Sequence, residues 1–164
     1  MAHILCVCTA NICRSPVAAA LLRQRLQERG LTDWVVRSAG TWVQEKRGAS
    51  QYSVELMTEQ GLDITGHQAE MVDRQLLRDA DLVLCMETGH AEALRVEFPG
   101  SADKIFLMSE MLGKKYNIND PYGRSRDAYE TMVKELTAIT DVGLDEIIAR
   151  AESLAAARDV TSLQ

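Results

Sequence analysis

The chain has 164 residues, of which 46% are hydrophobic and 26% are charged, so it is long enough for one globular domain with a buried core. This composition excludes disordered, collagen-like and disulfide-scaffold proteins. The net charge of −6 argues against a nucleic-acid partner, because proteins that bind a phosphate backbone usually carry a basic face. We therefore expect a single domain over residues 1–164.

The first residues of the chain do not have the pattern of a secretion signal. The segment MAHILCVCTANICRSP has no basic region and only a five-residue apolar run. No stretch approaches the roughly 18 apolar residues of a membrane span. These features predict a cytoplasmic protein that has no membrane partner and whose thiols stay reduced.

Strand and helix patterns alternate along the chain. Short apolar runs predict strands over residues 3–7, 34–37, 81–86 and 104–108. Helical spacing predicts helices from 15 to about 30, over 50–60 and 73–79, from the third strand to about 98, and from 125 to about 157. Gly143 is a point where the last helix could bend. The alternation predicts an α/β fold with one mostly parallel sheet and helices on both faces.

The segment CVCTANICRSP, residues 6–16, holds three of the four cysteines and links the first strand to the first helix. It lies where the carboxyl end of a strand is expected, which is where such folds bind ligands. A zinc site is unfavourable, because no second ligand cluster follows the cysteines and His67 and His90 are isolated. A disulfide staple is also unfavourable in a reducing compartment.

Cys8 and Arg14 stand in the pattern Cys-x5-Arg-Ser. The N–H groups of a short loop that enters a helix, together with the helix dipole, form a cradle for a tetrahedral dianion. Arg14 would donate two parallel hydrogen bonds to phosphate oxygens, and the same field would favour a nucleophilic thiolate at Cys8. Ser15 could donate to the sulfur, and Asn11 tolerates left-handed backbone angles and can brace the loop. The alternative is that Cys8 is a small buried hydrophobic residue.

A thiolate that attacks a phosphate ester expels an alkoxide or phenoxide, which needs a proton donor. The candidate is Asp120, in the segment Asp-Pro-Tyr-Gly on a loop after the fourth strand. The alternative is an ordinary Asp-Pro turn.

These segments resemble the low molecular weight protein tyrosine phosphatase family. The family signature V-C-x-G-N-x-C-R-S-P matches Val7–Pro16 with one departure, Ala10 in place of glycine. Four further stretches resemble segments of the family. Ser38–Thr41 resembles its SAGT segment, and the residues around His67 resemble its H-x-A segment. Asp81–Met86 resembles its D-L-V-L-x-M strand, and Asp120–Gly123 resembles its DP loop. The resemblance covers residues 3 to about 153 and leaves a tail, 154–164, without an assigned role.

The resemblance implies a three-layer α/β fold with a four-stranded parallel sheet, and hydrolysis of phosphotyrosine in two steps without metal or cofactor. Cys8 would form a cysteinyl-phosphate, Arg14 would hold the phosphoryl oxygens, and Asp120 would protonate the phenolate and then activate water. The residues implied around the substrate are Thr9, Ala10, Asn11, Ile12, Cys13, Ser15, Trp42 and Tyr122. The residues implied to brace the loop are Asn11, Ser15, Ser38 and His67. The alternatives are a solvated loop histidine for His67 and a strand terminator for Ser38.

A phosphotyrosine ring needs an apolar slot, and Ile12, Trp42 and Tyr122 are its candidate walls. The alternative for Trp42 is a ring in the core. Phosphoarginine phosphatases of the same fold tend to carry threonine where this chain has Ile12, so we expect phosphotyrosine to be the substrate. The expected partners are phosphotyrosine proteins, including a tyrosine kinase, and a phosphate or other oxyanion in the site.

Two positions of the loop carry further expectations from the resemblance. Cys13 would be a reversible disulfide partner that shields Cys8 from over-oxidation, and packing under the loop is the alternative. Alanine at Ala10 would cost on the order of 1 kcal/mol at positive φ and nothing at negative φ, and we expect negative φ. Cys6 and Cys85 lie within apolar strand runs and are expected in the core.

Three other functions remain open from the sequence. An arsenate reductase on the same fold would need two further cysteines near the third strand, where this chain has only Cys85. A phosphoarginine phosphatase would share the loop. A non-catalytic phosphotyrosine-binding module should lack Cys8, Arg14 or Asp120, and all three are present.

Overall fold

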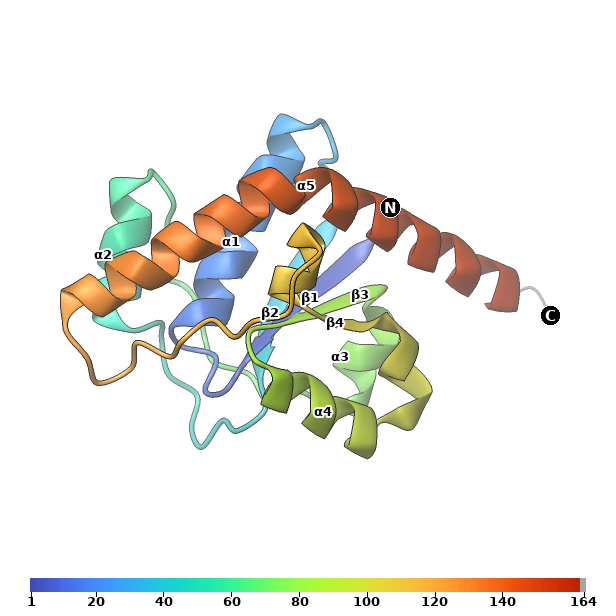
Figure 1. Ribbon diagram of the computed structural model, residues 1–164, viewed down its shortest axis with the longest axis horizontal. Helices are drawn as coiled ribbons and strands as arrows, with labels where there is room; N and C mark the ends of the chain where they lie inside the picture. The colour runs from blue at the N-terminus through green and yellow to red at the C-terminus, as the bar shows by residue number, and fades with distance from the viewer. Residues whose placement is uncertain (163–164) are drawn as a thin grey trace.

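A computed structural model describes residues 1–162 and contains one parallel sheet between two layers of helices (Figure 1). The four strands follow the order β2-β1-β3-β4, and each neighbouring pair is parallel. Their bounds are β1 His3–Cys8, β2 Val35–Gly40, β3 Leu82–Cys85 and β4 Ile105–Leu107. The predicted three-layer α/β fold with a four-stranded parallel sheet is confirmed.

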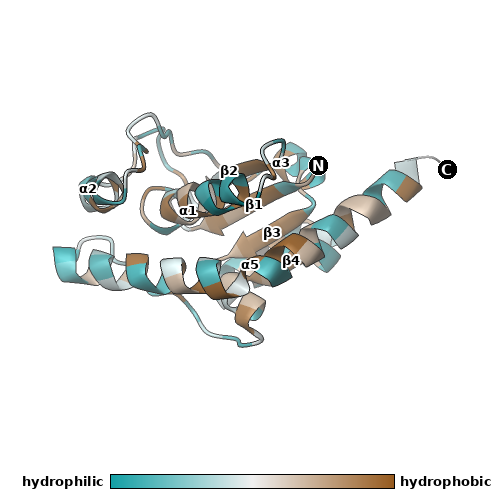
Figure 2. Ribbon diagram, turned by 90° about the horizontal axis from the view of Figure 1, so that it is seen from above, coloured by the Kyte–Doolittle hydropathy of each residue, from teal (hydrophilic) through white to brown (hydrophobic). Residues whose placement is uncertain are grey.

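The helices cover both faces of the sheet, with their apolar residues turned inward (Figure 2). Helices α1, α2 and α5 pack on one face, and α3 and α4 pack on the other. The bounds of the helices are α1 Arg14–Glu28, α2 Gln51–Glu59, α3 Arg74–Asp79, α4 Thr88–Glu97 and α5 Arg126–Ser162. Two 3₁₀ helices, η1 Pro99–Lys104 and η2 Met108–Leu112, flank β4.

Alternate residues of each strand enter the two cores. In β1, Ile4 and Cys6 belong to the core under α1 and α5, whereas Leu5 and Val7 belong to the core under α3 and α4. Because both faces are covered, β3, β4 and all of β1 after His3 consist of apolar residues. The edge strand β2 differs, since it exposes Arg37 and contains Ser38. Burial raises the pKa of Cys6 to about 12 and also raises that of Cys85, so both are protonated core thiols as expected.

Strand β2 is longer than the sequence pattern predicts. It continues through Ser38 and Ala39 to Gly40, because these residues pair in parallel with the last residues of β1. A Cβ atom on Gly40 would lie 2.4 Å from the carbonyl oxygen of Thr9, so only glycine allows this approach. The SAGT segment therefore ends a strand against the loop that follows Cys8.

Helix α5 runs from Arg126 to Ser162 and is not interrupted at Gly143, the point where the sequence allowed a bend or an interruption. Gly143 instead permits close packing, because a Cβ atom there would lie 3.1 Å from both the Cβ and the carbonyl oxygen of Met111. The helix also includes most of the predicted tail, and Arg158 Nη1 lies 2.9 Å from Oδ1 of the buried Asp81. Residues 163 and 164 of that tail lie outside the described residues.

The helices described within residues 1–162 include none that combines the length and the apolar character of a membrane span.

Candidate active site

The loop between β1 and α1 takes its shape from one residue in a left-handed conformation. Asn11 has a φ of 58°, and it is the only non-glycine residue with positive φ within residues 1–162. The strain therefore falls on the residue type that tolerates it best and not on Ala10. Alanine in place of the family's glycine is thus accommodated at negative φ, as expected.

A hydrogen-bond network under the loop holds this conformation. The Asn11 side-chain amide donates to Ser15 Oγ at 2.8 Å and to Ser38 Oγ at 2.9 Å, and its carbonyl oxygen accepts from the backbone N–H of Glu70 at 2.9 Å. His67 Nε2 donates to the backbone carbonyl of Asn11 at 2.6 Å. Burial lowers the pKa of His67, so the ring is a neutral donor and not a solvated loop side chain. The structure brings together the four residues that the sequence resemblance assigned to bracing.

The thiol of Cys8 lies at the end of β1, where the loop begins. Its Sγ atom is 2.9 Å from Ser15 Oγ. Ser15 is buried and receives a hydrogen bond from the Asn11 amide, so its own O–H acts as a donor. Its two possible acceptors are the carbonyl oxygen of Ala39, at 3.5 Å, and a thiolate at Cys8, which is closer. The N-terminus of α1, which begins at Arg14, adds a positive partial charge beside this sulfur.

Arg14 is 1% exposed, and its shortest contacts are both made by Nη1. Its Nη1 atom donates to Glu87 Oε1 at 2.6 Å and to the carbonyl oxygen of Ile118 at 2.7 Å. Its Nε is buried and has no hydrogen-bond partner among the described residues. A buried, unpaired N–H of a guanidinium is costly, so this atom indicates a place for an acceptor oxygen. The edge formed by Nε and Nη2 is the fork that binds two oxygens of a phosphate.

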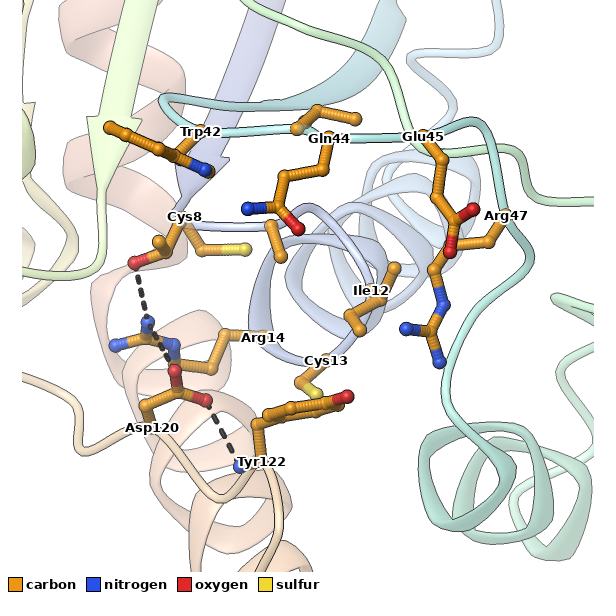
Figure 3. Close-up of a pocket in the computed structure, with 13 residues that line it drawn as sticks. Cys8, Ile12, Cys13, Arg14, Trp42, Gln44, Glu45, Arg47, Asp120 and Tyr122 are labelled. Atoms are coloured by element: carbon orange, nitrogen blue, oxygen red, sulfur yellow. Dashed lines mark hydrogen bonds and ion pairs between the residues drawn. The ribbon is translucent and has the colours of Figure 1, made fainter.

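A cavity of about 250 Å³ opens above Cys8 and Arg14, at the carboxyl ends of the strands (Figure 3). Of the residues expected to contact the substrate, it is lined by Thr9, Ala10, Ile12, Cys13, Trp42 and Tyr122. Asn11 and Ser15 do not line it, since they act beneath the loop. Trp42 is 66% exposed at the rim, which excludes the alternative of a ring in the core.

Asp120 also lines the cavity, beside Arg14 (Figure 3). Its Oδ1 accepts from the backbone N–H of Tyr122 at 3.0 Å, and its Oδ2 lies 3.6 Å from Arg14 Nη2. The preceding residues fasten this loop to the end of β3, because Ile118 N–H donates to the Met86 carbonyl at 2.9 Å. The Asp-Pro segment is thus a turn that also directs a carboxyl group into the cavity.

The charged groups of the cavity suit an anion at its base and offer no metal site. Arg14 lies at the base, whereas Glu45, Arg47 and Asp120 lie around it. Within residues 1–162, no cluster of three or more His, Cys, Asp or Glu side chains could hold a metal ion.

Comparison with known protein families accounts for this arrangement. A family model described as low molecular weight phosphotyrosine protein phosphatase matches residues 3–150 of the chain. The chain belongs to this family. Its members are cysteine-dependent hydrolases, so the chain is an enzyme of the phosphatase class, which argues against the non-catalytic binding module.

Individual members of the low molecular weight phosphatase family are similar over most of their length. A probable low molecular weight protein-tyrosine-phosphatase, EpsP, from Ralstonia solanacearum is 34% identical over 92% of this chain and 97% of its own. A protein-arginine-phosphatase from Bacillus subtilis is 34% identical over 81% of this chain and 88% of its own. The crystal structure of a low molecular weight protein tyrosine phosphatase from T. tengcongensis superposes with a TM-score of 0.83 at 36% identity, covering 89% of this chain and 99% of the other.

Two residues that position groups at the base of this phosphatase site were not anticipated from the sequence, and neither were the lining residues in the segment 43–47. Glu87 forms the ion pair that holds Arg14, and His90 contacts the side chain of Thr9. Both follow the carboxyl end of β3, the neighbour of β1, and this position in a parallel sheet was the signal that could have found them. In the sequence, His90 stands out only as an isolated histidine.

Proposed function

We propose that the chain hydrolyses phosphotyrosine in proteins through a cysteinyl-phosphate intermediate on Cys8. The supporting observation is the buried guanidinium of Arg14, whose Nη1 is occupied by Glu87 and a backbone carbonyl and whose Nε has no partner among the described residues. Nη2 makes only longer contacts, to Thr9 and Asp120, so the edge formed by Nε and Nη2 can receive an oxyanion beside the sulfur. Such an edge in a pocket with a thiol nucleophile and a carboxyl group suits transfer of a phosphoryl group.

In the first step, Arg14 and the loop N–H groups receive the phosphoryl oxygens. The Cys8 thiolate attacks phosphorus, the bond from phosphorus to the tyrosine oxygen breaks, and Asp120 gives its proton to the departing phenolate. In the second step, the Asp120 carboxylate takes a proton from water, which attacks phosphorus as the bond to sulfur breaks. Ser15, 2.9 Å from the sulfur, stabilises the thiolate that leaves.

The walls of the cavity support an aromatic substrate. Ile12 is buried against the cavity, and Trp42 and Tyr122 offer exposed rings at its mouth. A tyrosine ring would bury apolar surface against all three. The partners proposed are cytoplasmic phosphotyrosine proteins, among them a tyrosine kinase, and we propose no nucleic-acid or membrane partner.

Phosphoarginine is the second candidate substrate. A relative of similar identity from Bacillus subtilis is named a protein-arginine-phosphatase. The carboxyl groups of Glu45 and Asp120 line the cavity and could accept hydrogen bonds from a guanidino group. We favour phosphotyrosine, because the apolar side chain of Ile12 offers no partner to the N–H groups of phosphoarginine.

A panel of matched phosphotyrosine, phosphoarginine and phosphoserine peptides tests this choice. We expect the highest kcat/KM with phosphotyrosine, and little turnover of phosphoserine, whose short side chain does not reach across the walls. The Ile12→Thr variant should lose about 10-fold in kcat/KM for phosphotyrosine, the usual effect of removing an apolar contact. The ratio of its kcat/KM for phosphotyrosine to its kcat/KM for phosphoarginine should therefore be smaller than in wild type. Ile12→Val is the matched control and should stay near wild type. A wild-type preference for phosphoarginine would contradict the assignment.

Cys13 is proposed as the redox partner of Cys8. Its Sγ lies 3.3 Å from both Tyr129 Oη and Ser50 Oγ, and burial raises its pKa, so it is a protonated thiol beneath the loop. Peroxide would oxidise the Cys8 thiolate to a sulfenic acid and be reduced to water. The Cys13 sulfur would then displace a second water to form a disulfide, which an external thiol reduces.

We expect peroxide to inactivate the wild-type enzyme and a thiol to restore most of its activity. In the Cys13→Ser variant the sulfenic acid has no partner and is oxidised further, so less activity should return. Cys85→Ala, which removes a core thiol away from the site, should recover like wild type. Equal recovery by Cys13→Ser would show that Cys13 only packs under the loop.

A further inference from the structure

His90 is a buried histidine that the proposed mechanism does not use. It is 5% exposed and lies in the first turn of α4, close to the loop that follows β1. Its Nδ1 accepts a hydrogen bond from the backbone N–H of Glu87 at 3.1 Å. Its Nε2 lies 2.8 Å from the side-chain oxygen of Thr9.

These contacts determine which ring nitrogen carries the proton. Burial, together with the positive charge of Arg14, lowers the pKa of His90 to about 4, so the ring is neutral at ordinary assay pH. Because Nδ1 is an acceptor, the single proton resides on Nε2. His90 therefore donates a hydrogen bond to Thr9 Oγ1.

Both acceptor positions of the Thr9 hydroxyl oxygen are then occupied, and its O–H remains available as a donor. Its oxygen accepts from His90 Nε2 and, more weakly, from Arg14 Nη2 at 3.4 Å, and a hydroxyl oxygen has two acceptor positions. The hydrogen bonds within residues 1–162 include no acceptor for the Thr9 O–H. Thr9 lines the cavity beside Arg14, so the unused donor lies next to the place where the oxyanion binds.

We propose that the Thr9 hydroxyl is an additional hydrogen-bond donor to the phosphoryl group and that His90 is the positioning residue that orients it. The inference rests on the proposed function, since it adds a donor to the same oxyanion site. The neutral ring receives the N–H of Glu87, the residue that also holds Arg14. One short segment after β3 thus positions two neighbouring donors, the guanidinium and the hydroxyl.

Direct titration with inorganic phosphate tests the role of Thr9 without requiring turnover. Thr9→Val preserves the shape of the side chain but removes the donor, and we expect it to weaken phosphate binding by about 10-fold, the typical effect of a hydrogen bond to a charged group. Thr9→Ser keeps the hydroxyl and should bind within about 3-fold of wild type. Thr131→Val, an exposed hydroxyl on α5, is the matched control and should bind like wild type.

A double-mutant cycle tests whether His90 acts through Thr9. His90→Phe should weaken phosphate binding in the wild-type background and have a much smaller effect in the Thr9→Val background, because the donor that it orients is then absent and only its contact with the Glu87 N–H is lost. His90→Gln can still donate an N–H to Thr9 and should recover part of the loss. A merely structural role for His90 would give additive losses and no recovery by glutamine.

The outcomes separate this inference from the proposed function. Phosphate binding by Thr9→Val equal to that of wild type would overturn the role of the hydroxyl, and additive losses in the cycle would overturn the role of His90. If wild type binds phosphate in a Thr9-dependent way but does not hydrolyse an aryl phosphate, the proposed function fails and the inferred anion contact stands.

Discussion

Replacement of Cys8 by serine is expected to abolish turnover of aryl phosphates, with a loss of roughly 10⁴–10⁶-fold in kcat. A serine hydroxyl at this position is a poor nucleophile, because the loop and the N-terminus of α1 stabilise a thiolate but cannot ionise an alcohol to a comparable extent. Phosphate binding should persist, since the edge of Arg14 and the loop N–H groups remain in place.

The Cys8→Ser experiment needs two measurements, kcat with an aryl phosphate and affinity for inorganic phosphate. Mass spectrometry of acid-quenched enzyme should detect a phosphorylated cysteine in wild type and none at this position in the variant. The control variant Cys85→Ala removes a buried thiol from the core under α3 and α4, on the other face of the sheet from Cys8, and should have the same kcat as wild type. Turnover by Cys8→Ser within about 10-fold of wild type would refute the nucleophile assignment.

Loss of the carboxyl group at Asp120 is expected to lower kcat for phosphotyrosine by about 10²–10⁴-fold, which is the usual contribution of a positioned acid. The loss should be largest for substrates with a basic leaving group, such as the tyrosine phenolate. In kcat/KM, which reports the first step alone, the loss should be small for an acidic phenol, which departs without a proton. A plot of log kcat/KM against leaving-group pKa should therefore become steeper in the Asp120→Ala variant.

Comparison of two substitutions separates proton donation from the structural role of Asp120. Asp120→Asn can still accept the hydrogen bond from Tyr122 N–H but cannot donate a carboxyl proton, so it should be as slow as Asp120→Ala. Recovery of kcat by asparagine would instead show that the side chain only shapes the turn. Asp141→Ala, which disrupts a surface ion pair with Arg25, is the control and should leave kcat unchanged.

The parts of the site that are close in sequence could be read from the chain itself. Cys8 and Arg14 belong to one loop between a strand and a helix, and local geometry decides how such a loop presents N–H groups and a guanidinium. The left-handed residue also fell where the sequence allowed it, at Asn11. Ile12 was recognised as a wall because it lies in this same loop.

The parts of the site that come from distant segments needed the fold. Arg14 is oriented by Glu87 and by the carbonyl oxygen of Ile118, and His90 reaches Thr9. Nothing in the local pattern marks a backbone carbonyl as a ligand of an arginine. Sequence spacing likewise could not decide whether Trp42 lies in the core or at the rim, because an aromatic residue fits both positions.

By itself, the sequence determined the order of strands and helices, the class of fold and the thiol-arginine loop, because apolar periodicity and short loops are local properties of the chain. Only the tertiary structure decided the length of β2, the continuity of α5 through Gly143 and the partners of Arg14. Each of these depends on a contact between residues far apart in sequence: β2 on pairing with β1, Gly143 on packing against Met111, and Arg14 on the segment after β3. Such contacts exist only once the sheet has brought those segments to the same place.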